Sequence, residues 1–103
     1  MNAESFMNNE GHMKPGFSKA DLPALVLEAL QALGGRGTIV AVSRHIWEAH
    51  ESELRDSGIL FYTWQYDIRW AANYLRRTGT MRSAESSPVG LWEVTPHALP
   101  KAQ

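Results

Sequence analysis

The fold is decided by residues 63–79, TWQYDIRWAANYLRRTG, which form the longest stretch of helical periodicity in the chain. At about 100° per residue, an apolar arc gathers around Trp64. The members of this arc are Trp64, Ile68, Ala71, Ala72, Leu75 and Thr78. Thr63 offers an N-cap and Gly79 a left-handed C-terminal stop, so the pattern predicts a helix that closes a core.

The opposite arc of this segment carries a different chemistry. Its members are Gln65, Tyr66, Arg69, Asn73, Arg76 and Arg77. Guanidinium groups, amides and a phenol are the side chains suited to guanine, adenine and phosphate. The arc is therefore a candidate DNA-facing surface, and a solvated helix face is the alternative.

Upstream, an amphipathic pattern starts after Asp21 and predicts a first helix. Its apolar positions are Leu22, Leu25, Val26, Ala29, Leu30 and Leu33. Pro23 falls in the first turn, where a missing N–H is harmless, and Gly34 with Gly35 ends the helix.

Between these two segments, Thr38, Ile39 and Val40 form a β-branched run that predicts a short edge strand. A second helix is expected from about Ala41 into residues 51–54. It would face the core with Val42, Ile46 and Ala49. Trp47 falls outside that arc, where it would cover a neighbouring loop or contact a partner or second copy.

Downstream of Gly79, two strands are expected at residues 80–83 and 91–95, joined by the loop 84–90 into a hairpin. Trp92 and Val94 alternate with Leu91, Glu93 and Thr95, so one strand face can cover the core. The order helix, strand, helix, helix, hairpin predicts an α+β winged helix-turn-helix fold, with three helices, a small antiparallel sheet and a β-hairpin wing. The winged-helix domain is expected over residues 18–96, with a flexible arm at 1–17 and a short tail at 97–103.

Composition is typical of a single domain. The chain has 103 residues, is 44% hydrophobic and lacks cysteine, which excludes disulfides and thiolate metal sites. Because no apolar run approaches the roughly 20 residues that cross a bilayer, and no signal peptide is evident, a cytoplasmic bacterial-type protein without a membrane partner is expected.

Charge is unevenly distributed along the chain. The formal net charge is −1, yet residues 57–83 hold Arg69, Arg76, Arg77 and Arg82 against Asp67 alone. A basic segment in an otherwise acidic domain is typical of a DNA-facing element.

Two segments also suggest a family. Residues 68–79, IRWAANYLRRTG, followed by residues 87–95, SPVGLWEVT, resemble the amino-terminal winged-helix domain of Mrr-type restriction endonucleases, a similarity spanning about residues 22–95. The resemblance implies a DNA-recognition module. It implies that Gln65, Arg69, Asn73 and Arg76 face DNA, and that structural positions are held by Ile68, Trp70, Ala71 and Leu75.

The sequence departs from that family in two places. The nuclease domain that usually follows has no counterpart in these 103 residues, so cleavage is not expected. Val89 stands where the family tends to have a basic residue before the wing glycine. Arg82, Ser86 and Ser87 would have to replace its phosphate contact.

Other chemistry has little support. The chain has no Gly-Lys-Ser/Thr phosphate loop, nucleophile elbow or His-Glu-x-x-His helix. His45 and His50 diverge on a helix, and the carboxylates of residues 48–56 are expected to form a solvated acidic face. No enzyme activity, metal or cofactor is expected.

Two functions are consistent with these patterns. The first is recognition of double-stranded DNA through the third helix and wing, in transcription regulation or a restriction-type system, as a monomer, a homodimer or with a separate effector protein. The alternative is a non-catalytic docking or dimerisation module. The candidate DNA contacts are Thr63, Gln65, Tyr66, Arg69, Asn73, Arg76, Arg77, Arg82, Ser86 and Ser87.

Overall fold

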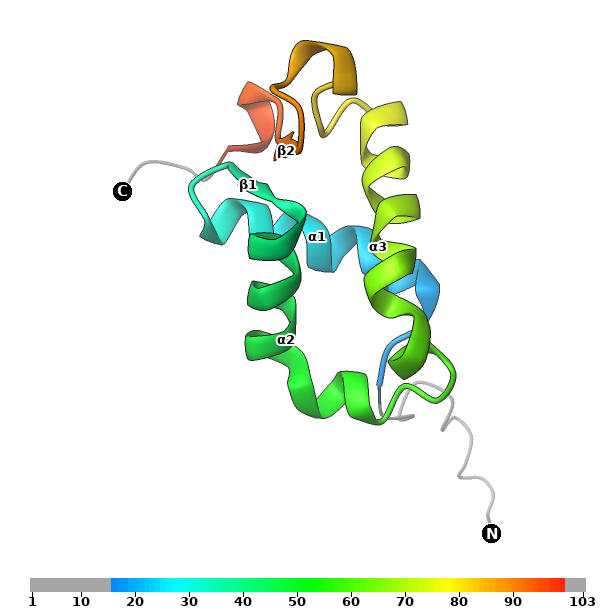
Figure 1. The fold of residues 1–103 in the computed structure, drawn as a ribbon. Coiled ribbons are helices and arrows are strands. Elements are labelled where there is room, and N and C mark those ends of the chain that lie inside the picture. The colour runs from blue at the N-terminus through cyan, green and yellow to red at the C-terminus, as the bar shows by residue number, and fades with distance from the viewer. Residues whose placement is uncertain (1–15, 100–103) are drawn as a thin grey trace, which may run out of the picture.

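Three α-helices and a two-stranded antiparallel sheet make up residues 16–99, the part of the chain that the computed structural model describes (Figure 1). The elements are η2 (Lys19–Asp21), α1 (Leu22–Ala32), β1 (Arg36–Thr38), α2 (Ile39–Arg55), α3 (Leu60–Arg77), η3 (Ala84–Ser86), β2 (Leu91–Glu93) and η4 (Pro96–Ala98), where η denotes a 3-10 turn. This α+β layout is compatible with a winged helix, as the sequence predicts. Most of the predicted arm and tail lies outside the described residues.

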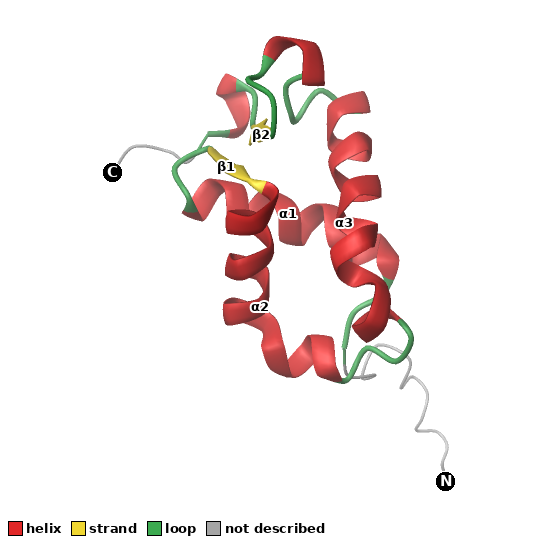
Figure 2. Cartoon of the chain, viewed as in Figure 1, coloured by secondary structure: helices red, strands yellow, loops and turns green. Residues whose placement is uncertain are grey.

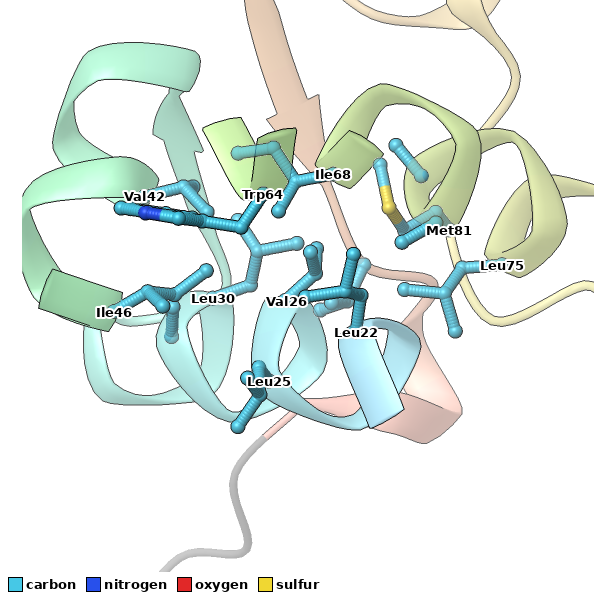
Figure 3. Packing of buried hydrophobic residues seen from close by; sticks show 14 of the residues in the cluster. Leu22, Leu25, Val26, Leu30, Val42, Ile46, Trp64, Ile68, Leu75 and Met81 are labelled. Atoms are coloured by element: carbon cyan, nitrogen blue, oxygen red, sulfur yellow. The ribbon is translucent and has the colours of Figure 1, made fainter. Parts of the chain in front are cut away.

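Helix α1 crosses between α2 and α3, and the two strands lie at one end of that pair, opposite the α2–α3 turn (Figure 2). The largest fully buried side chains come from all three helices: Leu22, Val26, Leu30, Val42, Ile46, Leu54 and Ile68. They form one hydrophobic cluster with Trp64, which lies near Val42 and Ile46 in Figure 3. Within residues 16–99, no helix has the length and apolar character needed to span a membrane.

Most of the core predicted from periodicity is buried, but three positions are exposed: Leu33, Ala49 and Thr78. Leu33 and Thr78 are C-cap residues, where the helix ends and its arc stops applying. Ala49 lies directly before a kink in α2 at His50, whose φ is −136°. Burial predicted from helical periodicity is therefore wrong at two helix ends and beside the kink.

Gly79 ends α3 as predicted. Its φ of +83° lies in the left-handed region, and the N–H groups of Gly79 and Thr80 donate to the carbonyls of Arg76 and Leu75. These two bonds form a Schellman motif. The motif turns the chain sharply from α3 toward the sheet.

The predicted strand at Thr38–Val40 is placed too late in the chain. Strand β1 stops at Thr38, whose side chain accepts the N–H of Ala41 at 3.1 Å and so caps α2. Ile39 and Val40 are the first helical residues rather than strand residues. A hydroxyl cap outweighs the weak β-preference of two branched residues at a helix start.

The predicted N-cap at Thr63 is also wrong. Helix α3 begins a turn earlier at Leu60, because 3-10-type hydrogen bonds from Leu60 and Phe61 to Ser57 and Gly58 start it. Thr63 lies inside the helix and donates its hydroxyl to Asp67 at 2.8 Å.

The predicted hairpin is reduced to a small remnant. Strand β2 pairs with β1, placing Arg36 opposite Glu93, while the segment after α3 contributes only the Met81–Val94 bridge. Residues 84–86 turn into η3, which ends the pairing after Arg82. The loop 84–90 is therefore a compact wing and not an extended hairpin.

Candidate nucleic-acid interface

The outward arc of α3 is exposed in the middle of the helix. Because Trp64 and Ile68 are buried against α1 and α2, Gln65, Tyr66 and Arg69 point to solvent on the other side. Asn73 continues this arc one turn later. The sequence-predicted face of α3 is thus present as a solvent-facing surface.

Two arginines on this face are held in place by carbonyl and amide oxygens. Arg69 donates Nη1–H to the carbonyl of Gln65 at 2.9 Å. Arg76 donates Nε–H to the carbonyl of Arg82 and Nη1–H to Oδ1 of Asn73, both at 3.2 Å. Neither guanidinium forms an ion pair within residues 16–99, so their positive charges are not neutralised by a neighbouring carboxylate.

Adjoining hollows link this arc of α3 to α2 and to the wing. A hollow of about 320 Å³ is lined by Ile39, Arg69, Asn73, Arg76, Gly90 and Trp92. A groove of about 420 Å³ continues between α2 and α3, and its lining adds Arg44. Arg69 belongs to both. We call this continuous surface the α3 face.

Sequence reasoning missed the contribution of α2 to the α3 face. Arg44 is exposed, has no ion pair within residues 16–99 and lies on the same groove as Arg69. Its charge lies outside residues 57–83, so the charge distribution did not point to it. The antiparallel return of α3 along α2 was the available signal, because it brings the N-terminal half of α2 beside the outward arc.

Two predicted DNA contacts lie elsewhere. Arg82 pairs with Glu93 at 3.6 Å, and Arg36 contacts the same carboxylate at 3.6 Å. Since successive strand residues alternate faces, Glu93 lies on the opposite side of β2 from Trp92 and the α3 face. Arg77 lies over the Tyr74 ring, 5.9 Å from its centroid, on the other flank of α3.

Three predicted hydroxyl contacts are engaged or covered. Thr63 is bonded to Asp67, and Ser86 donates to the carbonyl of Ser83 at 3.1 Å. The Ser87 hydroxyl oxygen is buried and lacks a hydrogen-bond partner within the described chain. The wing instead presents the fully exposed Val89.

Aromatic side chains form a stripe along α3, spaced four residues apart. Its members are Tyr62, Tyr66, Trp70 and Tyr74. Trp70, assigned a structural position by the family resemblance, is 37% exposed, stacks on Tyr74 at 5.9 Å and carries the Lys19 ammonium 5.0 Å from its ring. It lies on the flank of α3 and outside the core because it falls well away from the arc around Trp64.

Trp47 packs onto α3. Its ring lies nearly parallel to that of Trp64, with centroids 6.3 Å apart, and 6.4 Å from that of Phe61. The Arg55 guanidinium lies 5.2 Å from its centroid. The ring therefore joins α2 to α3 within the domain and does not cover a loop, and the suggested partner contact stays a prediction.

Acidic side chains gather along the C-terminal half of α2, whereas Arg44 lies in its N-terminal half. They are Glu48, Glu51, Glu53 and Asp56, all exposed, with Glu51 bonded to Arg55 at 2.8 Å. His50 contacts Glu28 at 2.8 Å. Within residues 16–99, no three His, Cys, Asp or Glu side chains are placed to hold a metal ion. The domain thus separates a cationic face from an acidic end.

Comparisons of the whole chain with protein-family models, with curated proteins and with solved structures found no match.

Proposed function

We propose that this domain binds duplex DNA through the α3 face. The observation that carries the proposal is the grouping of Arg44, Arg69 and Arg76 on one continuous surface, with no carboxylate partner for any of them among residues 16–99. Local positive charge attracts the phosphate backbone even when the net charge of a protein is slightly negative. A cytoplasmic location, where DNA is accessible, belongs to this proposal.

In this proposal α3 enters the major groove, whose width admits one α-helix. Arg69 suits guanine and Asn73 suits adenine, because a guanidinium and a carboxamide can each make two hydrogen bonds to these base edges. Arg44 and Arg76 flank them and would contact phosphates, which fix the register of the helix. The resemblance noted in the sequence implies DNA-facing positions at Arg69, Asn73 and Arg76, but implies nothing for Arg44.

The test is titration of a fluorescently labelled duplex, followed by anisotropy at low salt. We expect the double variant Arg69→Ala/Arg76→Ala to lose binding by at least tenfold, since a base contact by one arginine is worth about 1–3 kcal/mol and loss of a phosphate contact weakens binding further. The matched control is Lys19→Ala/Arg36→Ala, which removes the same charge from outside the α3 face. Equal losses in the two double variants would show that net charge, and not this face, determines binding.

A docking function is the second candidate, favoured by the exposed aromatic stripe. Tyr62 and Tyr66 are 82% and 74% exposed, and tyrosine, tryptophan and arginine dominate the energetically important residues of protein interfaces. The measurement that separates the candidates is sedimentation velocity combined with the DNA titration. Concentration-dependent self-association lost in Tyr62→Ser/Tyr66→Ser, together with no duplex binding, would favour docking.

A further inference from the structure

The groove between α2 and α3 has the dimensions of a small-molecule site. It encloses about 420 Å³ and is lined by Ile39, Val40, Ser43, Arg44, Trp47, Trp64, Gln65 and Arg69. Ligand clefts in proteins typically enclose about 300–1,000 Å³ and combine apolar walls with a few polar groups. The groove meets both criteria.

Its walls suit a flat apolar ring. The near-parallel indoles of Trp47 and Trp64 lie along it, and Trp47 is fixed in place by Arg55, which is itself held by Glu51. Val40 and Ile39 add branched aliphatic surface from the first turn of α2. Aromatic side chains bind flat rings by offset stacking or by edge contacts.

The polar groups of the groove select an anion. Both charged lining residues, Arg44 and Arg69, are cationic, and no lining residue is acidic. Gln65 and Ser43 add neutral hydrogen-bonding groups. A carboxylate accepts two parallel N–H bonds from one guanidinium and adds ionic attraction, whereas a cationic ligand is repelled by both arginines.

We propose that this groove binds a small aromatic carboxylate, with the ring against Trp47 and the carboxylate between Arg44 and Arg69. Binding would then exclude DNA, because Arg69 and Gln65 belong both to the groove and to the α3 face. This second consequence rests on the proposed DNA-binding function, whereas ligand binding itself does not. The groove would thus let a metabolite-sized anion displace the domain from DNA.

The direct test uses ¹H–¹⁵N NMR with two probes of matched shape, 1-naphthoate and 1-naphthylmethylammonium. We expect naphthoate to shift the indole N–H of Trp47 and the backbone amides of Ser43 and Arg44 saturably, while the indole N–H of Trp70, on the other flank of α3, stays in place. The cationic probe should produce no saturable shift. Equal responses to both probes would overturn the proposal, because the arginines would then not select charge.

Two variants make the test specific to the groove. Arg44→Ala removes an exposed side chain and should weaken naphthoate binding by about two- to fivefold, the range of one exposed ion pair. Ser43→Phe fills the groove and should abolish the saturable shifts. Unchanged naphthoate affinity in Ser43→Phe, with a folded spectrum, would place the probe elsewhere and refute the site.

The competition arm separates this proposal from the DNA proposal. If the sites overlap, the apparent Kd for labelled duplex should rise in proportion to naphthoate concentration and should be unaffected by the cationic probe. An apparent Kd for duplex that stays unchanged at saturating naphthoate would refute mutual exclusion. Naphthoate binding in the absence of any duplex binding would refute the DNA function alone.

Discussion

The salt dependence of duplex binding should report how many arginines of the α3 face contact phosphates. Three arginines that form no ion pair within residues 16–99 lie there, Arg44, Arg69 and Arg76, and each phosphate contact contributes about −0.9 to the slope of log affinity against log salt. In the proposed arrangement Arg44 and Arg76 contact phosphates and Arg69 contacts a base, so the slope should be about −1.8, which corresponds to a roughly 12-fold loss of affinity between 50 and 200 mM salt. Arg76→Ala should reduce that loss to about 3.5-fold.

The assay is anisotropy of a labelled duplex measured at several salt concentrations for each variant. Arg82→Ala is the informative control, because its guanidinium is paired with Glu93 on the other side of β2. It should leave the slope unchanged. Arg76→Lys should also retain the slope, since the charge remains. A slope reduced by Arg82→Ala and unaffected by Arg76→Ala would mean that DNA binds the opposite side of the sheet, and the assignment of the α3 face would be wrong.

Three further predictions concern the scaffold. Ile68→Ala should cost about 2–5 kcal/mol in urea unfolding because Ile68 is fully buried; a loss below 1 kcal/mol would show a loosely packed core. Gly79→Ala should lower stability by about 1–2 kcal/mol through the left-handed φ alone, since nothing lies within 4 Å of an added Cβ. Gly79→Asn should cost less stability than Gly79→Ala. Equal thermal midpoints for the two variants and the parent protein would contradict this. Thr95→Val should lose about 0.5–1.5 kcal/mol, because it removes the hydroxyl that the carbonyls of Gly79 and Thr80 share. Thr95→Ser should retain most of the stability in the same melts, and identical effects of the two variants would assign the loss to packing.

Local patterns were enough to predict the helical part of the fold. The arc around Trp64 follows from side-chain spacing alone, and Gly79 marks the end of α3 because few other residues tolerate its backbone conformation. Thr38 was harder to interpret, because a threonine before two branched residues suits both a strand and a helix cap. Only pairing of β1 with the distant β2 determines where the strand ends.

The candidate site was predictable to the extent that it lies on one helix. Gln65, Arg69 and Asn73 share a face by periodicity, so their grouping needed no tertiary information. The neutralisation of Arg82 by Glu93 depends on a contact between segments 11 residues apart that the sequence does not encode locally. Arg44 joins the α3 face only through the packing of α2 against α3.

The wing is anchored at its base by hydrogen bonds to the end of α3 and to the sheet. Arg76 donates to the carbonyl of Arg82, and the Met81–Val94 bridge joins the two segments that flank the loop. The Thr95 hydroxyl donates to the carbonyl of Gly79 in the turn after α3. Most of the loop 84–90 lies beyond these bonds, although Gly90 lines the α3 face beside Arg76. Exposed positions such as Val89 can therefore be changed to try new contacts while the bonds at the base are preserved.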